Sequence, residues 1–578
     1  MKIIQRTPLT DPDKLPERLH PVLRRVYAAR NVGTERELST RLEHLHPLTA
    51  LSGLQRAVDL LCDALRDGRR ILIIADFDAD GATSCALAVR ALRLLGARDV
   101  RYVVPNRFQF GYGLTPEIVA VAAQQQPDLI ITVDNGISSV EGVRAALMRG
   151  IRVLITDHHL PGAVLPEADA IVNPNQPGDE FPSKNLAGVG VIFYVMTALR
   201  TRLREIGWFA QQRIDEPNLA QILDLVALGT VADVVPLDHN NRILVAQGLA
   251  RIRADVCNAG IRALLQVAGK PPQRSSANDL AFLIAPRLNA AGRLEDMALG
   301  IECLLSDDDA AALGMARRLD ELNRERRCIE ATMQEQALSA LAAMRLDAEA
   351  LPRGVCLFDP AWHQGVIGIL AARIKDRLHR PVIAFAPADA GELKGSARSV
   401  RGVHIRDVLD AVAARHPGLL SKFGGHAMAA GLSLKPENFD AFSAAFDLEV
   451  RHHLPEEQIH GVIESDGALS AEEFSLELAE ALRAAGPWGQ GFPEPLFDGI
   501  FEVIDRRIVG ERHLKLALKP DGAARPLDAI AFNACSNAAA PPAIFPGAQL
   551  RVAYKLDVNE YRDERSLQLL VQHMEPAD

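Results

Sequence analysis

The chain has 578 residues with 74 acidic and 64 basic side chains, which gives a formal net charge of −10. This charge argues only weakly against a nucleic-acid partner, because a local basic channel can coexist with an acidic exterior. The composition, 48% hydrophobic and 24% charged, indicates a globular protein of three or four domains, with no apolar run long enough to span a bilayer and no signal-peptide core at the N-terminus. The seven cysteines contain no CxxC pair, which argues against a structural zinc site or a disulfide framework, so we expect a reducing cytoplasm.

The first strongly patterned segment, RRILIIADFDADGATS at residues 69–84, carries three alternating aspartates. They are Asp76, Asp78 and Asp80. An EF-hand loop begins in the same way, but it needs a preceding helix and a glutamate at its twelfth position, which is Leu87 here. Residues 71–75 are apolar and β-branched, which predicts a buried strand, and residues 82–96 have helical spacing. The aspartates therefore lie on a predicted strand-to-helix turn, and the calcium-loop interpretation fails.

Apolar strand-like runs then alternate with helical patterns up to about residue 174. The predicted strands lie within residues 71–75, 99–105, 128–136, 152–159 and 170–174. This rhythm is typical of a parallel, doubly wound α/β sheet, in which ligands bind beyond the carboxyl ends of the strands. The polar residues that follow two of these strands are Asp134 and Asn135, and then Asp157, His158 and His159.

The second half of the chain changes character three times. A helical stretch at 218–237 contains Asp233, and residues 307–344 form one long helical pattern that we interpret as a connector. A second α/β unit follows, and the remainder alternates strands with Gly/Pro turns, as a small OB-like β-barrel would. The expected domains are an N-terminal segment (1–65), a first α/β domain (66–250), a helical linker (251–348), a second α/β domain (349–455) and the barrel (456–578).

Five of the polar residues have the chemistry of a metal site. They are Asp78, Asp80, Asp134, His158 and Asp233. Carboxylates suit hard divalent cations, and the imidazole shifts the preference from calcium toward manganese or magnesium. Four converging carboxylates would repel one another without cations, so we expect two ions, bridged by Asp134 and able to activate water at a phosphoryl group. A single DxD after a strand is more often a helix cap, but the combination on one sheet indicates a metal site.

Several motifs also carry a family resemblance. DFDADG, VDNG, DHH and LGTVADVVPL resemble successive motifs of the DHH phosphoesterase superfamily, and FGGHAMAAG resembles the signature of its DHHA1 companion domain. PNRFQFGYGL, LAGVGV, APRLNAAGRL and WHQGVIGILAARI resemble the bacterial RecJ exonucleases, which degrade single-stranded DNA from the 5′ end. The resemblance runs from about residue 70 into the barrel and implies a DHH domain, a long connecting helix, a DHHA1 domain and an OB-like barrel.

The resemblance assigns roles to the polar residues of the first domain. It implies that the five residues named above hold two Mn²⁺ or Mg²⁺ ions and that His159 lies beside the scissile phosphate. Asp76 is either a ligand or a supporting residue, since some members of the superfamily use a histidine where this chain has Ile74. Asp157 is expected to orient its neighbours.

Other residues are candidates for DNA contacts. Arg107, Ser396 and Arg398 are suggested as the 5′-phosphate site, because an arginine fork beside a hydroxyl suits a terminal phosphate. The further candidates are Arg287, Arg293, His363 and His426 for the phosphate backbone and Trp488 for base stacking. For each arginine the alternative is a solvated surface charge, for each histidine a structural role, and for Trp488 an anchoring aromatic in a Gly/Pro turn.

These patterns predict a metal-dependent single-stranded-DNA-specific 5′→3′ exodeoxyribonuclease that releases mononucleotides in DNA repair and recombination. One alternative is a small-substrate DHH phosphodiesterase acting on nanoRNA or cyclic dinucleotides, but such an enzyme needs no barrel. A non-catalytic single-stranded-DNA-binding scaffold is a second alternative, yet every expected ligand is present. The resemblance suggests a single-strand-binding protein and a helicase as partners, and we expect a monomer without a membrane association.

Overall fold

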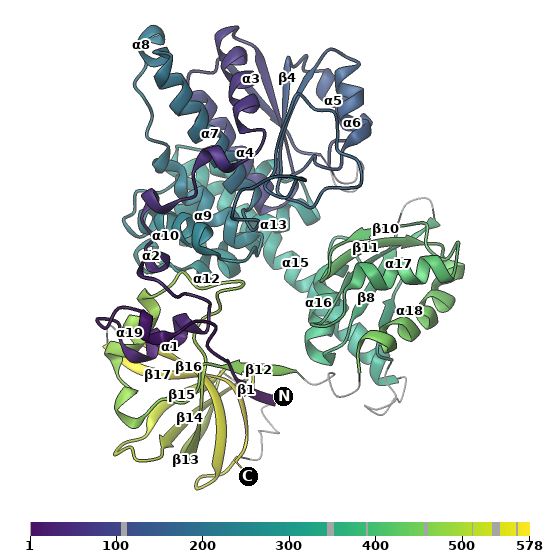
Figure 1. Ribbon diagram of the computed structural model, residues 1–578. Coiled ribbons are helices and arrows are strands. Elements are labelled where there is room, and N and C mark those ends of the chain that lie inside the picture. The colour runs from purple at the N-terminus through teal and green to yellow at the C-terminus, as the bar shows by residue number, and fades with distance from the viewer. Residues whose placement is uncertain are drawn as a thin grey trace. The chain divides into compact units, whose positions relative to one another are not determined.

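The computed structural model describes residues 2–105, 113–343, 352–388, 391–455, 461–510, 512–534, 544–561 and 564–577 (Figure 1). The chain divides into two compact units. The larger unit combines Ile3–Asp320 with Glu464–Asp578, and the smaller unit consists of Glu321–Ile463 with the first two residues. Within the described residues, no helix combines the length and the apolar character that crossing a membrane requires.

A five-stranded parallel sheet forms the first part of the larger unit. Its strands are β2 (Arg70–Ala75), β3 (Asp99–Val103), β4 (Leu129–Val133), β5 (Arg152–Thr156) and β6 (Ala170–Val172), in the order β3-β2-β4-β5-β6. All neighbours pair in parallel, which confirms the predicted doubly wound sheet. β4 is buried along its whole length, which explains its uninterrupted apolar sequence.

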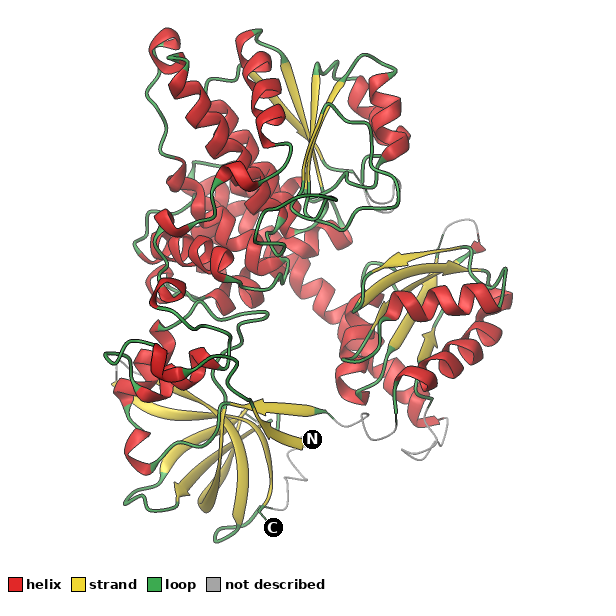
Figure 2. Cartoon of the chain, in the orientation of Figure 1, coloured by secondary structure: helices red, strands yellow, loops and turns green. Residues whose placement is uncertain are grey.

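Helices cover both faces of this sheet (Figure 2). One face is packed by α5 (Pro116–Ala123) and α6 (Val140–Leu147), whose Ile118 and Val143 share a core cluster with Ile74. The helices of the other face are α3 (Leu54–Arg66), α4 (Ala79–Leu94) and α7 (Gly188–Glu205). All neighbouring strands are parallel, and α4, α5 and α6 connect β2 to β3, β3 to β4 and β4 to β5, so the carboxyl ends of the strands and the amino ends of these helices meet at one edge.

A set of helices follows the sheet in the larger unit. They are α8 (Trp208–Gln212), α9 (Leu223–Ala232), α10 (His239–Arg253), α11 (Ala259–Val267), α12 (Ala277–Asp279), a π-helical turn (Leu280–Ile284), α13 (Ala285–Leu294) and α14 (Ala298–Leu305). α10 packs closely along α9, because a Cβ on Gly248 would lie only 2.2 Å from the carbonyl oxygen of Leu223. The predicted connector is confirmed as a single helix, α15 (Asp309–Ala343), which continues from the larger unit into the smaller.

The C-terminal strands close into a barrel, as predicted. They are β13 (Phe497–Val509), β14 (His513–Pro520), β15 (Leu527–Ala531), β16 (Gln549–Tyr561) and β17 (Glu564–Pro576), in the order β13-β14-β15-β17-β16. Only the pairing of β15 with β17 is parallel among these strands. The barrel belongs to the same compact unit as the parallel sheet, and α19 (Leu476–Ala484) lies beside β16.

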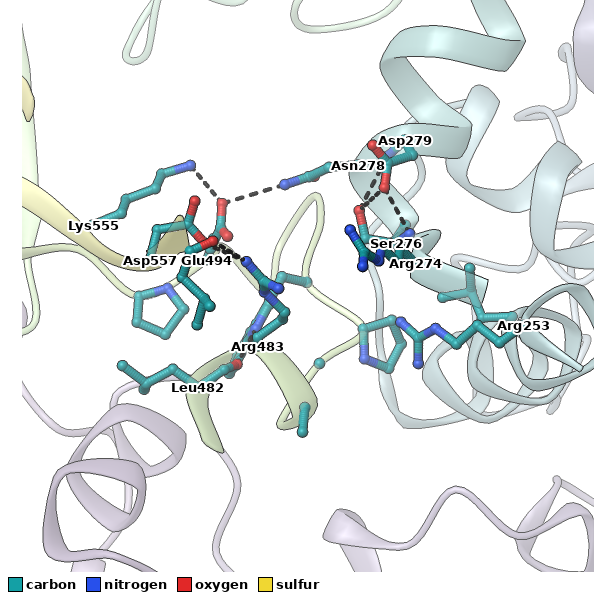
Figure 3. Close-up of a pocket in the computed structure, with 18 of the residues that line it drawn as sticks. Arg253, Arg274, Ser276, Asn278, Asp279, Leu482, Arg483, Glu494, Lys555 and Asp557 are labelled. Atoms are coloured by element: carbon teal, nitrogen blue, oxygen red, sulfur yellow. Dashed lines mark hydrogen bonds and ion pairs between the residues drawn. The ribbon is translucent and has the colours of Figure 1, made fainter. Parts of the chain in front are cut away.

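A polar cavity of about 590 Å³ lies between the barrel and the helices that follow the sheet (Figure 3). Across it, Arg274 forms an ion pair of 2.8 Å with Glu560, and Asn278 Nδ2 donates to Glu494 over 3.2 Å. Glu494 also pairs with Lys555 of β16 at 2.5 Å. The first two contacts connect residues more than 200 positions apart and help to hold the barrel and the helices that follow the sheet in one unit.

The N-terminal segment packs against the polypeptide that leads into the barrel. Its elements are β1 (Lys2–Gln5), paired with β12 (Val462–Ser465), α1 (Pro21–Ala28) and α2 (Glu35–Leu38). Arg30 makes a two-pronged contact of 2.8 and 2.9 Å with Asp466, and both side chains are buried. Sequence patterns alone assigned no role to the first 65 residues. The structure shows that β1 and α1 pack on the barrel side of the larger unit, whereas α3 covers the parallel sheet.

The smaller unit has a five-stranded mixed sheet. Its strands are β7 (Val355–Phe358), β8 (Val382–Pro387), β9 (Leu393–Arg398), β10 (Lys422–Gly425) and β11 (Ala429–Leu434), in the order β10-β11-β9-β8-β7. Two separate core clusters lie against this sheet, one with α16 (Ile367–Leu378) and one with α17 (Ile405–Arg415) and α18 (Phe439–His453). The predicted second α/β unit is therefore confirmed.

Candidate metal centre and nucleic-acid contacts

The turn between β2 and α4 is shaped by its first two aspartates. Asp78 is the N-cap of α4, and its Oδ1 accepts the backbone N–H groups of Asp80 and Gly81, each over 3.0 Å. Asp76 Oδ1 accepts the N–H of Phe77 over 2.8 Å. A Cβ on Gly81 would lie 2.5 Å from the carbonyl oxygen of Asp76, so only glycine allows this turn to be so tight. Asp78 is thus a helix cap that still has a second carboxylate oxygen for a cation.

Asp80 lies deeper, in the first turn of α4, and is only 1% exposed. Its carboxylate accepts the N–H groups of Gly188 (2.7 Å) and Val189 (3.0 Å) at the start of α7, where unpaired helix N–H groups favour an anion. Burial raises the pKa of Asp80 to about 7, and the charge of Asp78 adds to this increase. The carboxylate is therefore positioned by backbone donors but destabilised by its surroundings.

Asp134, His158 and Asp233 come from three different elements and meet in space. Asp134 directly follows β4, His158 follows β5, and Asp233 is the C-cap of α9. His158 Nε2 lies 3.1 Å from Asp134 Oδ1 and 3.4 Å from Asp233 Oδ2. Burial raises the pKa of both aspartates well above the usual range, and the neighbouring carboxylates raise it further. The repulsion expected from the sequence is thus present in the structure.

Asp157 and His159 form a pair beside this cluster. His159 Nδ1 lies 2.7 Å from Asp157 Oδ1, and the same oxygen accepts the backbone N–H groups of His158 (2.7 Å) and His159 (3.1 Å). Burial opposes the charge of Asp157, but the hydrogen bond and the nearby histidines outweigh it and lower its pKa. Burial likewise opposes the imidazolium of His159, yet Asp157 and the other carboxylates raise its pKa to about 9. Asp157 fixes the ring and leaves Nε2 directed away from it.

The donor set fits divalent cations. Three overlapping groups have ligand atoms within 4.8 Å of one another: Asp134 with His158 and His159, Asp80 with His158 and Asp233, and Asp76 with Asp78 and Asp134. Asp134 belongs to two of these groups, consistent with a bridging position. Because several buried carboxylates face one another without an equal number of basic groups, cations are the partners that would offset their charge. Asp76 joins the cluster, which supports a ligand role for it.

Two glycines allow the helices to approach these ligands. A Cβ on Gly188 would lie 2.6 Å from Asp134 Oδ1, and a Cβ on Gly229 would lie 2.7 Å from Asp80 Oδ1. Asn289 of α13 also supports the site, because its Oδ1 accepts the N–H of Ala79 over 2.8 Å. These three residues were not predicted from sequence as site residues, although the motifs LAGVGV, LGTVADVVPL and APRLNAAGRL contain them.

The structure gives Arg287 a structural environment. This side chain is only 8% exposed, and its Nε and Nη2 lie 3.0 and 2.9 Å from Asp320 Oδ1. It also donates to the carbonyl oxygen of Leu283 over 2.5 Å. The buried ion pair contradicts the predicted contact with the DNA backbone, because a guanidinium enclosed in this way offers little surface to a phosphate. Arg293, in the last turn of α13, is partly exposed and stays a candidate.

Ser396 and Arg398 lie together in the smaller unit. Arg398 Nη1 donates to Ser396 Oγ over 3.1 Å and to the carbonyl oxygen of Ala397 over 2.8 Å. Both side chains face the first turn of α16, where a Cβ on Gly368 would lie 2.9 Å from Ser396 Oγ and 3.0 Å from Arg398 Nη2. A hydroxyl, a guanidinium and a helix N-terminus thus converge, a combination suited to an anion. Arg107 lies outside the described residues.

The two candidate histidines of the smaller unit are both exposed. His363 Nδ1 accepts the N–H of Gly365 over 3.1 Å, just before α16. The backbone N–H of His426 donates to Ala429 over 2.8 Å in the turn between β10 and β11. Neither residue is a buried core histidine, although His426 does lie in a tight turn, and both stay candidates for phosphate contacts.

Trp488 is an anchoring residue. It is 7% exposed, its ring stacks on Phe492 at 5.1 Å and on Tyr27 at 6.0 Å, and its Nε1 donates to the carbonyl oxygen of Leu482 over 2.9 Å. The prediction that Trp488 stacks on a base is therefore wrong, because the ring is enclosed and stacked by other side chains of the protein. The Gly/Pro-rich turn around it is a packing element.

Comparisons with known proteins agree with this geometry. Family models match the DHH family, N-terminal domain, at residues 70–230, the DHHA1 domain at 351–452 and the RecJ OB domain at 465–573. The single-stranded-DNA-specific exonuclease RecJ is 55% identical in Dickeya dadantii and 52% identical in Escherichia coli, each over 576 residues and 99% of both chains. The chain belongs to the RecJ family of single-stranded-DNA-specific exonucleases.

Solved structures of the RecJ family share the fold of this chain. The crystal structure of RecJ from Thermus thermophilus in complex with Mn²⁺ matches with a TM-score of 0.82 at 30% identity and covers 100% of this chain and 79% of that one. The complex of the same protein with Mg²⁺ matches with a TM-score of 0.76 at 28% identity, covering 100% and 78%. One of these structures contains Mn²⁺ and the other Mg²⁺, the two kinds of ion predicted from the ligand chemistry, which confirms the cofactor class for the family.

Proposed function

We propose that this protein is a metal-dependent exonuclease that hydrolyses single-stranded DNA from its 5′ end and releases mononucleotides. The observation that carries the proposal is the cluster of Asp80, Asp134, His158 and Asp233 at the carboxyl edge of a parallel sheet. The relatives at 52–55% identity are named single-stranded-DNA-specific exonucleases over essentially their whole length, which supports the substrate class. DNA repair and recombination are the processes in which we place it.

The ligands and His159 divide the work at the centre. Asp78, Asp80, Asp134, His158 and Asp233 would hold the two divalent cations, with Asp76 beside them. When bound, such a pair polarises the phosphodiester and lowers the pKa of a water molecule. Asp157 holds His159 at Nδ1, so His159 Nε2 can donate a proton to a phosphate oxygen on which charge develops. Although burial opposes the charged ring, the Asp157 carboxylate raises the pKa of His159, which favours the protonated form of this donor.

The 5′→3′ direction of degradation would be set in the smaller unit. We propose that Ser396 Oγ, the Arg398 guanidinium and the first turn of α16 bind a terminal 5′ phosphate, with His363 and His426 at the edge of this anion site. The arginine fork matches two phosphate oxygens at once, whereas a 5′ hydroxyl would leave the half-buried guanidinium without that partner. A preference for 5′-phosphorylated ends follows.

We further propose that the protein acts as a cytoplasmic monomer on strands exposed by a helicase and coated by a single-strand-binding protein. These partners rest on the family resemblance. Co-purification and stimulation of strand degradation by each purified partner would test them directly.

The central experiment uses a single-stranded DNA oligonucleotide labelled at its 3′ end, incubated with Mn²⁺ or Mg²⁺. We expect a ladder that shortens from the 5′ end, faster on a 5′ phosphate than on a 5′ hydroxyl. Asp134→Ala should abolish the ladder, whereas Asp307→Ala, which removes a carboxylate that is 87% exposed, should leave it intact. Arg398→Lys should remove the preference for the 5′ phosphate and retain cleavage. Intact DNA together with hydrolysis of a dinucleotide would instead assign the protein to the small-substrate branch.

A further inference from the structure

Val234, the residue directly after the ligand Asp233, has an unusual backbone. Its φ is +61°, in the left-handed region. It follows the C-cap of α9, a position where helices commonly end with a left-handed glycine because glycine has no Cβ. A β-branched residue is the least suited to this conformation. The helix that delivers a metal ligand therefore ends in local strain.

Packing does not explain the choice of valine. The Val234 side chain is 60% exposed, so it contributes little to the core. Most of the other described non-glycine residues with positive φ are polar types that tolerate this region better, including Asn31, Asp134 and Asp255. Strained residues that persist without a packing benefit occur preferentially at functional sites.

The surrounding structure fixes this conformation on both sides. The N–H of Asp233 donates to Gly229 over 3.0 Å and completes the last turn of α9. Three residues beyond Val234, the N–H of Leu237 donates to the carbonyl oxygen of Gln490 over 2.7 Å. A Cβ on Gly491 would lie 3.0 Å from the Cβ of Pro236, so the Trp488 turn holds this segment in place. The exposed isopropyl group is thus carried by a fixed backbone segment, one residue after Asp233.

We propose that Val234 is a substrate contact whose isopropyl group packs against the apolar face of the nucleoside, the deoxyribose or the base, of the nucleotide bound at the metal centre. The inference rests on the proposed function, because it requires a nucleotide there. Val234 directly follows the proposed cation ligand Asp233, so the Cα atoms of the two residues lie about 3.8 Å apart. The side chain supplies an apolar surface where every ligand is polar, and glycine would relieve the strain but lose that surface.

Two substitutions separate the side chain from the backbone. Val234→Ala removes the two exposed methyl groups, and Val234→Gly also removes the strain. Matched controls are Val256→Ala, another exposed valine, and Gln126→Gly, an exposed left-handed residue. Val256 lies just beyond the C-terminal end of α10. The C-terminal half of α10 packs beside the start of α9, and this start lies about 15 Å along α9 from Asp233. Gln126 precedes β4, at the amino end of that strand.

The measurements are the KM and kcat for a 5′-phosphorylated single-stranded oligonucleotide with Mn²⁺, and the Kd of the same fluorescently labelled oligonucleotide in EDTA. We expect both Val234 variants to raise KM and Kd at least five-fold and to change kcat less than two-fold. The thermal midpoint of Val234→Gly should equal or exceed that of the wild type, and both controls should match the wild type in KM.

A third readout tests the alternative that Val234 merely positions Asp233. The affinity for Mn²⁺, measured by calorimetric titration, should be unchanged in Val234→Ala and Val234→Gly. A fall in Mn²⁺ affinity parallel to the rise in KM would overturn the inference, and so would KM and Kd values within two-fold of the wild type. If the wild type fails to degrade the oligonucleotide, both the proposed function and the Val234 contact are wrong. If the wild type is fully active and the Val234 variants behave like it, only the Val234 contact is wrong.

Discussion

Asp80 has a buried carboxylate that suits cation binding but lowers the stability of the cation-free fold when it is charged. Two backbone N–H groups at the start of α7 hold its carboxylate, and yet burial raises its pKa to about 7. Asp134 and Asp233 have pKa values raised in the same direction and for the same first cause. Without cations, these carboxylates therefore favour protonation in the folded state, and a bound cation would replace the proton.

This linkage predicts how stability depends on pH in EDTA. In the unfolded chain an aspartate titrates near pH 4, and in the folded protein Asp80 titrates near pH 7. Between these values the folded state binds more protons, so the free energy of unfolding should fall as pH rises through this window and be higher at about pH 5.5 than at about pH 7.5. Thermal unfolding in EDTA checks this.

Asp80→Asn provides the control for that experiment, because it removes the titrating group while keeping an acceptor for the α7 N–H groups. Its thermal midpoint should depend less on pH than that of the wild type. Saturating Mn²⁺ should abolish the advantage of acid pH in the wild type, since protons and cations compete for the same oxygens. A wild-type midpoint in EDTA that rises across the same pH window would contradict the expected linkage.

At the scale of elements, the approach of α7 to the ligands depends on its first residue. Gly188 donates its N–H to Asp80, and a Cβ at this position would lie 2.6 Å from Asp134 Oδ1. The contact is with the buried carboxylate of Asp134, a proposed metal ligand that has little room to move, so the helix start or this carboxylate must shift. An alanine at this position would therefore disturb the centre although alanine is the better helix former.

We expect Gly188→Ala to lower kcat/KM at least 100-fold and to weaken Mn²⁺ binding. Gly314→Ala in α15 is the matched control, because a Cβ there meets nothing within 4 Å. That change should stabilise the protein by about 0.5–1 kcal/mol through helix propensity and leave activity unchanged. Kinetics, Mn²⁺ titration and thermal unfolding of both variants test this expectation. Normal activity of Gly188→Ala would show that the site tolerates a shift of the start of α7 or of Asp134.

The elements and the clustering of the candidate metal ligands were predictable from sequence because their signals are local. The apolar run of β4 and the helical spacing of α15 each report burial along one segment, and Asp134 and His158 follow strands whose ends must converge in a parallel sheet. The buried ion pair of Arg287 was not predictable, since its partner Asp320 lies on another helix. Trp488 was misassigned for a similar reason: one of its two stacking partners, Tyr27, lies more than 450 residues away.

At the scale of the whole molecule, the larger unit is assembled from both ends of the chain. Arg30 and Asp466 form a buried ion pair, and Tyr27 stacks on Trp488, whose turn also holds the segment after Asp233 through Gln490 and Leu237. The barrel, the N-terminal helix and the metal-binding sheet therefore share one cooperative structure. The smaller unit has its own sheet and two core clusters.

This division predicts two calorimetric unfolding transitions that respond to different ligands. Mn²⁺ should raise only the transition of the larger unit, because the proposed metal ligands all lie there. In EDTA, a 5′-phosphorylated thymidine trinucleotide should raise the transition of the smaller unit more than its 5′-hydroxyl counterpart does, through Ser396 and Arg398. Arg398→Lys should remove this difference and leave the response to Mn²⁺ unchanged.

Arg30→Ala assigns the transitions independently of any ligand. It leaves Asp466 buried with a weakened ion-pair network, which typically destabilises a protein by about 3–5 kcal/mol, so only the larger unit's transition should move to lower temperature. Because Arg30 contacts the polypeptide that leads into the barrel, the barrel and the parallel sheet should still unfold together. If Arg30→Ala instead splits off a third transition, or if Mn²⁺ shifts both transitions equally, the cooperative unit is not the one that the packing defines.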